Sequence, residues 1–184
     1  MNEKIKKEGI EWLKAFAIGI IIFSVIRMFF FSNYVVEGES MMPTLQDGNK
    51  LVVNKIGYQI GELDRFDVIV FHANEEEDYV KRVIGLPGDQ IEYREDQLYI
   101  NGKKYDEPYL EKYREQVFGG RLTGNFNLME LTGGEIVPEN KIFVLGDNRL
   151  GSRDSREFGF VSVDQIVGKV DLRYWPMEEI AVSF

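Results

Sequence analysis

The sequence predicts a mainly β protein: an antiparallel β-sheet domain with a small loop-rich insertion, carried on one N-terminal transmembrane helix. Three observations predict this architecture. The 184 residues contain one long apolar run near the start, then short β-branched or aromatic runs separated by Gly-Asp turns, and no second long amphipathic helix. This length allows one anchor and one domain of roughly 150 residues.

The N-terminal apolar run covers residues 15–31, in which only Gly19, Ser24 and Arg27 are not strongly apolar. It would span roughly 25 Å as a helix, near the lower limit for the core of a bilayer. A buried helix of a soluble protein would show an apolar stripe instead of a fully apolar circumference. A cleaved signal peptide remains an alternative, because short spans with basic flanks look similar and a cut after Gly38 would fit.

Charge gives this span an orientation. Residues 1–14 carry a net charge of +1, whereas residues 28–184 hold 17 bases and 28 acids. Basic residues before a span favour a cytoplasmic N-terminus. We therefore expect a cytoplasmic tail over 1–14, an anchor over 15–33 and an extracytoplasmic domain over 34–184. The acidic domain also argues against nucleic-acid binding, because phosphates require a basic protein face.

The domain consists mostly of predicted strands. Residues 97–100 and 103–105 flank Asn101-Gly102, a strong hairpin signal. Residues 106–137 are polar and Gly-rich, and we expect them to form the insertion. Four further strands are predicted over residues 50–54, 67–71, 79–84 and 141–145.

The chain has no cysteine and one histidine, His72. A thiol nucleophile, a disulfide framework and a Cys-ligated metal are therefore excluded, and one histidine cannot supply a multi-His zinc site. Because His72 ends an apolar run and precedes a polar loop with three glutamates, we expect it at the surface. No metal and no cofactor are expected.

A serine, Ser40, lies between Gly38 and Pro43, shortly after the expected membrane exit. A turn of this kind can hold a serine exposed with backbone N–H groups turned outward, as a nucleophile with an oxyanion hole requires. Taken alone, a serine in a Gly/Pro loop is far more often an ordinary turn residue.

By period-two alternation, Lys81 shares a strand face with Tyr79 and Val83. Burial between such apolar side chains lowers the pKa of a lysine because it disfavours the ammonium form. A fall from about 10.4 to about 8 leaves roughly one lysine in ten neutral at pH 7. Neutral lysine can take a proton from a serine hydroxyl. A lysine that points to water is the alternative.

Three segments together resemble the signature segments of bacterial type I signal peptidases, the membrane-anchored Ser/Lys-dyad leader peptidases. They occur in that family's order after an N-terminal anchor. The segments are residues 40–45 (SMMPTL), 79–89 (YVKRVIGLPGD) and 146–156 (GDNRLGSRDSR). The resemblance covers roughly residues 10–175, and the single anchor is similar to that of Gram-positive members.

The resemblance implies catalytic roles. Ser40 would be the nucleophile, with its own backbone N–H in the oxyanion hole, and Lys81 the general base. Ser152 would hydrogen-bond Lys81 and orient it. Three further residues match a supporting ion-pair network: Asp147, Asp154 and Arg156.

The resemblance also implies a substrate that binds as an added β-strand, with shallow pockets for small side chains one and three residues before the cut. The pocket walls are expected from Val36, Met41, Leu45, Tyr79 and Val80. The sequence departs from the family pattern at two glycines. Gly38 stands where some members have a serine that donates to the oxyanion, and Gly151 stands where asparagine is commoner.

The implied function is that of a membrane-bound serine endopeptidase that removes signal peptides from secreted preproteins after a small-x-small motif. Expected partners are these signal peptides and the lipid bilayer, and contact with the protein-export machinery stays open. Two alternatives remain: a self-cleaving or partner-specific Ser/Lys peptidase, and a non-catalytic membrane-tethered binding module.

Overall fold

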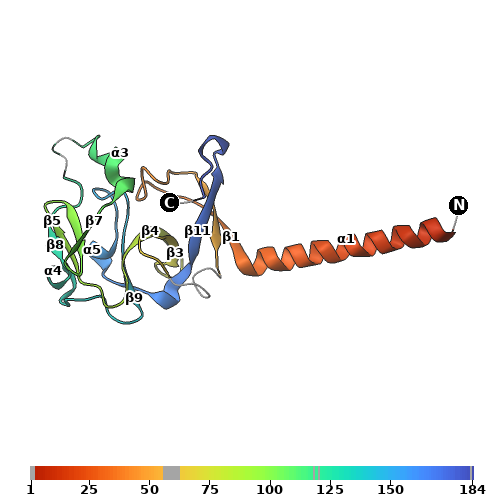
Figure 1. Cartoon of the computed structure of the whole chain (residues 1–184), viewed down its shortest axis with the longest axis horizontal. Coiled ribbons are helices and arrows are strands. Elements are labelled where there is room, and N and C mark those ends of the chain that lie inside the picture. Colours follow the sequence, from red (N-terminus) through yellow and green to blue (C-terminus); the bar gives the residue numbers. More distant parts are fainter. Residues whose placement is uncertain (1–2, 56–62, 118, 120, 183) are drawn as a thin grey trace.

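The computed structural model describes all residues except 1–2, 56–62, 118, 120 and 183. Helix α1 (Glu3–Phe30) projects from a β domain formed by the remainder of the chain (Figure 1). The helix starts earlier than the expected anchor, and strand β1 (Phe31–Val35) follows it directly. The last three residues expected in the anchor therefore lie in a strand, because their backbone pairs with strand β2 (Lys50–Asn54).

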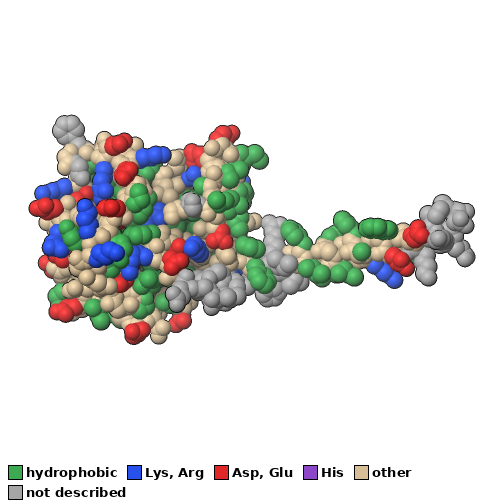
Figure 2. All heavy atoms as spheres, viewed as in Figure 1, with side chains coloured by type: hydrophobic (Ala, Val, Ile, Leu, Met, Phe, Trp, Pro, Cys, Tyr) green, Lys and Arg blue, Asp and Glu red, His purple; other side chains and the backbone are tan. Residues whose placement is uncertain are grey.

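Large apolar side chains cover the middle of α1 and are not packed against the domain (Figure 2). Those with at least half of their surface exposed are Ile10, Trp12, Leu13, Phe16, Ile18, Ile20, Ile21, Ile22 and Phe23. In the part of the chain that the structure describes, no helix combines the length and the apolar character needed to cross a membrane.

Seven strands form the first sheet, in the order β1-β2-β11-β3-β4-β9-β10, and every neighbouring pair is antiparallel. Beyond β1 and β2, these strands are β3 (Val68–His72), β4 (Asp78–Gly85), β9 (Lys141–Leu145), β10 (Val161–Ser162) and β11 (Ile166–Trp175). The predicted antiparallel fold is therefore confirmed. The predicted strands differ from β2, β3, β4 and β9 by at most one residue at each end.

The second sheet has the order β7-β6-β5-β8. Its strands are β5 (Ile91–Arg94), β6 (Gln97–Ile100), β7 (Lys103–Tyr105) and β8 (Phe126–Asn127). The expected insertion over 106–137 contributes β8, which pairs with β5, and it buries Leu110, Leu128 and Val137 completely or nearly so. The insertion is thus part of the core of the second sheet.

Short helices connect the strands. They are η1 (Pro108–Leu110), α3 (Glu111–Arg114), α4 (Leu128–Thr132), α5 (Ser155–Phe158), η2 (Val163–Gln165) and η3 (Met177–Glu179). His72, at the end of β3, is exposed, and its Nδ1 lies 2.6 Å from Asp78 Oδ1. The prediction of a surface histidine is confirmed.

Strand β11 was not predicted, although it is ten residues long and lies between β2 and β3. Its second half alternates charged residues (Lys169, Asp171 and Arg173) with apolar ones, a period-two signal that could have identified it. Gly168 in this strand approaches β2 so closely that a Cβ atom there would collide with the Asn54 carbonyl. The glycine therefore permits the packing of the central strands.

Candidate active site

Ser40 and Lys81 meet in the structure. Lys81 lies on β4 and donates a hydrogen bond from Nζ to Ser40 Oγ at 2.7 Å. A second hydrogen bond, 3.0 Å long, runs from Nζ to the Val80 carbonyl, and the Tyr79 ring centre lies 5.2 Å from the same atom. Only 3% of Lys81 is exposed, whereas Ser40 is half-buried. The amine is thus held against the hydroxyl and is itself almost inaccessible to water.

Burial lowers the pKa of Lys81 from 10.5 to about 8, and the charges of Asp154 and Asp147 partly oppose this fall. Removal of water disfavours the ammonium form more than the two distant carboxylates favour it. At pH 7 roughly one molecule in ten then carries a neutral amine, compared with fewer than one in a thousand for an unperturbed lysine. Lys81 can therefore act as a base near neutral pH.

The turn that carries Ser40 is fixed on both sides. Gly38 has a φ of +83°, a conformation that favours glycine, and its N–H donates to Asp47 Oδ1 at 2.8 Å. On the other side, Asn148 N–H donates to the Ser40 carbonyl at 3.0 Å. The Ser40 N–H itself has no acceptor among the described residues. It is therefore available for an oxyanion, whereas the Gly38 N–H is already used.

Ser152 lies close to this turn. A Cβ atom at Gly146 would collide with both Ser152 Oγ and the Ser40 carbonyl, so the three residues are tightly packed. Ser152 Oγ is buried and has no hydrogen-bond partner in the described part of the chain. The hydrogen bond to Lys81 that the family resemblance implies is therefore absent from this conformation.

Two ion pairs, one fully buried and one partly buried, hold the loop after β9. Arg82 donates from Nε and Nη2 to the two oxygens of Asp147 at 2.8 and 2.6 Å, and both side chains are inaccessible to solvent. Arg156 donates to both oxygens of Asp154 at 2.9 Å, and Asp154 Oδ2 also accepts the Gly146 N–H at 3.0 Å. The three expected support residues thus fix the backbone around Gly146.

Sequence reasoning missed a further buried network around Arg149. The Arg149 guanidinium is fully buried and forms an ion pair with Glu107 at 2.5 Å. It also donates to the Tyr93 hydroxyl at 2.9 Å and to Thr123 Oγ1 at 2.8 Å, while its Nε donates to the Gly146 carbonyl at 3.1 Å. This network connects the second sheet and the insertion to the loop beside Ser40. The partners lie far apart in the sequence, so no local pattern indicates them.

A cleft of about 410 Å³ contains Ser40 and Lys81. Four of the five expected wall residues line it, namely Val36, Met41, Tyr79 and Val80, and so does Gly151. Leu45 is fully buried and packs in the core cluster that also contains Val36 and Met41, so it does not line the cleft.

One wall of the cleft offers a strand edge. Strand β9 pairs with β4 only between Arg82 and Gly85, so that edge of β4 is unpaired over residues 78–81 in the described chain. All four of these residues line the cleft. An extended peptide could therefore hydrogen-bond to this edge beside Ser40. The described residues contain no group of three or more His, Asp or Glu side chains that could hold a metal ion.

The sequence also matches a known protein family. Residues 9–175 match the model of the family described as signal peptidase, peptidase S26. The chain belongs to this family. The S26 match includes all three segments that surround the cleft.

Individual S26 relatives agree with the family model. The chain is 59% identical to a signal peptidase I from Bacillus caldolyticus, over 100% of both chains. It is 47% identical to a signal peptidase IB from Staphylococcus aureus strain MRSA252, over 98% of this chain and 96% of the relative. The crystal structure of a signal peptidase I from Enterococcus faecalis V583 matches with a TM-score of 0.56 and 44% identity, covering 59% of this chain and 96% of that one.

Proposed function

We propose that the protein removes signal peptides from secreted preproteins, with Ser40 as nucleophile and Lys81 as general base. Membership of the signal peptidase family supports the serine endopeptidase reaction. The observation that carries the assignment of residues is the 2.7 Å hydrogen bond between a buried, poorly hydrated amine and the Ser40 hydroxyl.

The reaction proceeds by acyl transfer. Ser40 Oγ attacks the carbonyl carbon of the scissile bond while neutral Lys81 takes its proton. The Ser40 N–H donates to the negatively charged oxygen that develops on this carbonyl. Protonated Lys81 then gives its proton to the leaving amine, and the signal peptide remains as an ester on Ser40. Water attacks the ester, Lys81 accepts the proton of the water, and the Ser40 hydroxyl is restored.

The cleft favours small residues on both sides of one variable position. The Val36 and Met41 side chains are almost fully buried, so little depth remains for a substrate side chain above them. Because alternate residues of an extended peptide point to the same face, two small residues separated by one would contact this shallow surface. The specificity that follows is cleavage after a small-x-small motif.

The placement of the enzyme at the cell membrane is the second part of the proposal. We assign the helical part of the expected anchor, residues 15–30, to the membrane, residues 1–14 to the cytoplasm and the β domain that begins with β1 to the outer side. The exposed apolar side chains of α1 support contact with lipid, and the charge asymmetry of the chain supports this orientation. An active site close to the lipid would lie near the cleavage site of a preprotein whose apolar segment is in the bilayer.

The decisive experiment incubates the full-length protein in detergent with a purified preprotein and sequences the N-terminus of the product. We expect cleavage after a small-x-small motif and none with Ser40→Ala. Cleavage of the chain's own peptide bonds alone would indicate a self-cleaving peptidase. No cleavage of any preprotein would indicate a binding module.

Membrane topology is tested separately by cysteine labelling. Introduced cysteines are labelled without background because the natural chain contains no cysteine. Single cysteines at Lys7 and Lys103 would be treated with an impermeant maleimide in intact cells. We expect labelling at position 103 only, and labelling of both positions only after the cells are opened. Labelling of position 7 in intact cells would contradict the orientation.

A further inference from the structure

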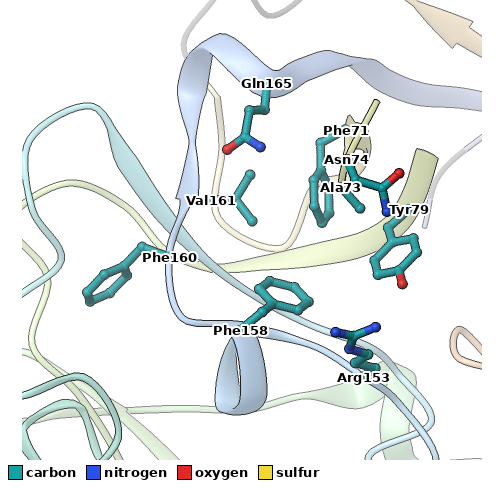
Figure 3. A pocket seen from close by; sticks show the side chains of 9 residues that line it. All are labelled: Phe71, Ala73, Asn74, Tyr79, Arg153, Phe158, Phe160, Val161 and Gln165. Carbon is teal, nitrogen blue, oxygen red and sulfur yellow. The ribbon is translucent and has the colours of Figure 1, made fainter. Parts of the chain in front are cut away.

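A second hollow lies beside the catalytic cleft and is not used by the proposed mechanism. It has a volume of about 190 Å³ and aromatic walls (Figure 3). Four aromatic side chains line it, and three of them pack together: the ring centres of Phe71, Tyr79 and Phe158 are 6.2 to 6.4 Å from one another, and Phe160 is the fourth. A cavity of about 150 Å³ can hold a benzene molecule, so this hollow is large enough for a sizeable side chain.

The hollow adjoins the catalytic cleft. Tyr79 and Arg153 line both of them, and Figure 3 shows these two side chains close together on one side of the hollow. A peptide in the cleft would therefore pass the entrance of the hollow at Tyr79.

The pleat of β4 determines which substrate residue faces this entrance. Val80 packs on the side of the sheet that contains Val36 and Met41, whereas Tyr79 packs on the opposite side with Phe71. A peptide paired with the free edge of β4 has the same alternation as β4 itself. If its two small residues face Val36 and Met41, the residue between them must face Tyr79 and the hollow.

Arg153 provides a cationic group at this entrance. Asn74 and Gln165, which also line the hollow, already bond to neighbouring residues, and the Tyr79 hydroxyl donates to Glu77 Oε2 at 3.5 Å. Arg153 is exposed and has no carboxylate partner among the residues that the structure describes. Its guanidinium can therefore pair with a carboxylate of a bound peptide, a geometry that arginine favours.

We propose that the aromatic hollow and Arg153 form a specificity subsite for the middle residue of the small-x-small motif. The apolar stem of that residue lies against Tyr79, and an acidic end group pairs with Arg153. Signal peptides with glutamate at this position are preferred to those with lysine. This inference rests on the proposed function and adds a charge preference at a position otherwise treated as variable.

The test compares two peptides that differ only in the middle residue, Ala-Glu-Ala and Ala-Lys-Ala before the cut, at low salt. With the full-length enzyme we expect kcat/KM to be about fivefold higher for the glutamate peptide, the size typical of a partly exposed ion pair. In Arg153→Glu the preference should reverse. In the natural protein, raising the salt concentration should reduce the preference.

Arg121→Glu is the matched control, because it makes the same charge change at an exposed arginine that lines neither the cleft nor the hollow. This variant should keep the preference for glutamate. An equal ratio in the natural protein and Arg153→Glu, with both peptides still cleaved, would overturn the subsite but leave the proposed function intact. Failure of the natural protein to cleave either peptide would overturn the proposed function itself.

A second variant tests the hollow without changing charge. Ala73 lines the hollow, and Ala73→Leu would reduce its volume. We expect this variant to lower kcat/KM for Ala-Phe-Ala relative to Ala-Ala-Ala by about threefold or more, because a large middle side chain loses its site. An unchanged ratio between these two peptides would show that the middle residue does not enter the hollow.

Discussion

Lys81 Nζ lies 2.7 Å from Ser40 Oγ, although the two residues are 41 positions apart in the sequence. The strand pairing of β4 places the lysine, and a turn tied to the loop after β9 places the serine. The two groups thus meet through independent parts of the fold. Their separation is already within the range for direct proton transfer.

Replacing either member of this pair should abolish cleavage. We expect Ser40→Ala and Lys81→Ala to lower kcat/KM by about a thousandfold or more, because the nucleophile or its base is lost. Lys81→Arg should be equally inactive, since a guanidinium does not become neutral. Lys103→Ala, at an exposed lysine, should retain normal activity. Circular dichroism would check that every variant is folded, and substantial cleavage by Lys81→Arg would rule out a lysine base.

Activity should depend on pH through Lys81. The pKa of about 8 means that the reactive neutral amine is a minority below that pH. We expect kcat/KM to rise about tenfold per pH unit below pH 8 and then to level off. A pH series with one peptide measures this profile. A constant rate between pH 6 and 9 would contradict a titrating base.

Folding stability should also depend on the protonation of Lys81. The burial that makes the amine available as a base near neutral pH should lower the stability of the protein. Because folding lowers the Lys81 pKa from 10.5 to about 8, the folded state binds fewer protons between these values, and stability rises with pH across that window. Below pH 8 the full cost, about 3 kcal/mol, is present. Lys81→Met should therefore be inactive yet melt at a higher temperature at pH 7. A lower melting temperature for Lys81→Met would show that burial of the Lys81 amine does not destabilise the protein.

The buried pair of Arg82 and Asp147 should be essential for folding stability. Asp147→Ala leaves the Arg82 guanidinium buried without its partner, and we expect a loss of about 3–5 kcal/mol in the free energy of unfolding. Glu92→Ala removes the partner of Arg94 in a partly exposed pair and should change stability little. Urea titrations would compare the two variants. Equal effects would mean that burial of the pair has no energetic importance.

A substitution at Ser152 can separate an effect on the orientation of Lys81 from an effect on folding stability. Its hydroxyl has no hydrogen-bond partner among the described residues, so Ser152→Ala should leave the melting temperature almost unchanged. If the hydroxyl orients Lys81 during the reaction, kcat should fall about tenfold or more while the pH midpoint of the profile shifts. Unchanged kcat and midpoint would exclude an orienting role.

Local patterns predicted the strands that contain their own signal, such as β2, β6 and β9. The position of β11 between β2 and β3 was not predicted, because the close approach at Gly168 depends on a segment more than 100 residues away in the chain. The resemblance implied a pairing of Ser40 with Lys81, which meet in the structure, but it indicated neither the Arg149 network nor the burial of Leu45. These depend on side chains from several elements that converge only in the folded domain.

The neighbouring basic residues Lys81 and Arg82 point to opposite sides of β4, where Lys81 contacts Ser40 and Arg82 pairs with Asp147. A slip of β4 by one position would exchange them, presenting a permanently charged guanidinium to Ser40 and a single-pronged amine to Asp147. A misregistered molecule would then lose its reactivity and its central ion pair together. Molecules with this incorrect register should consequently be inactive and unstable. They should not act as proteases with relaxed specificity.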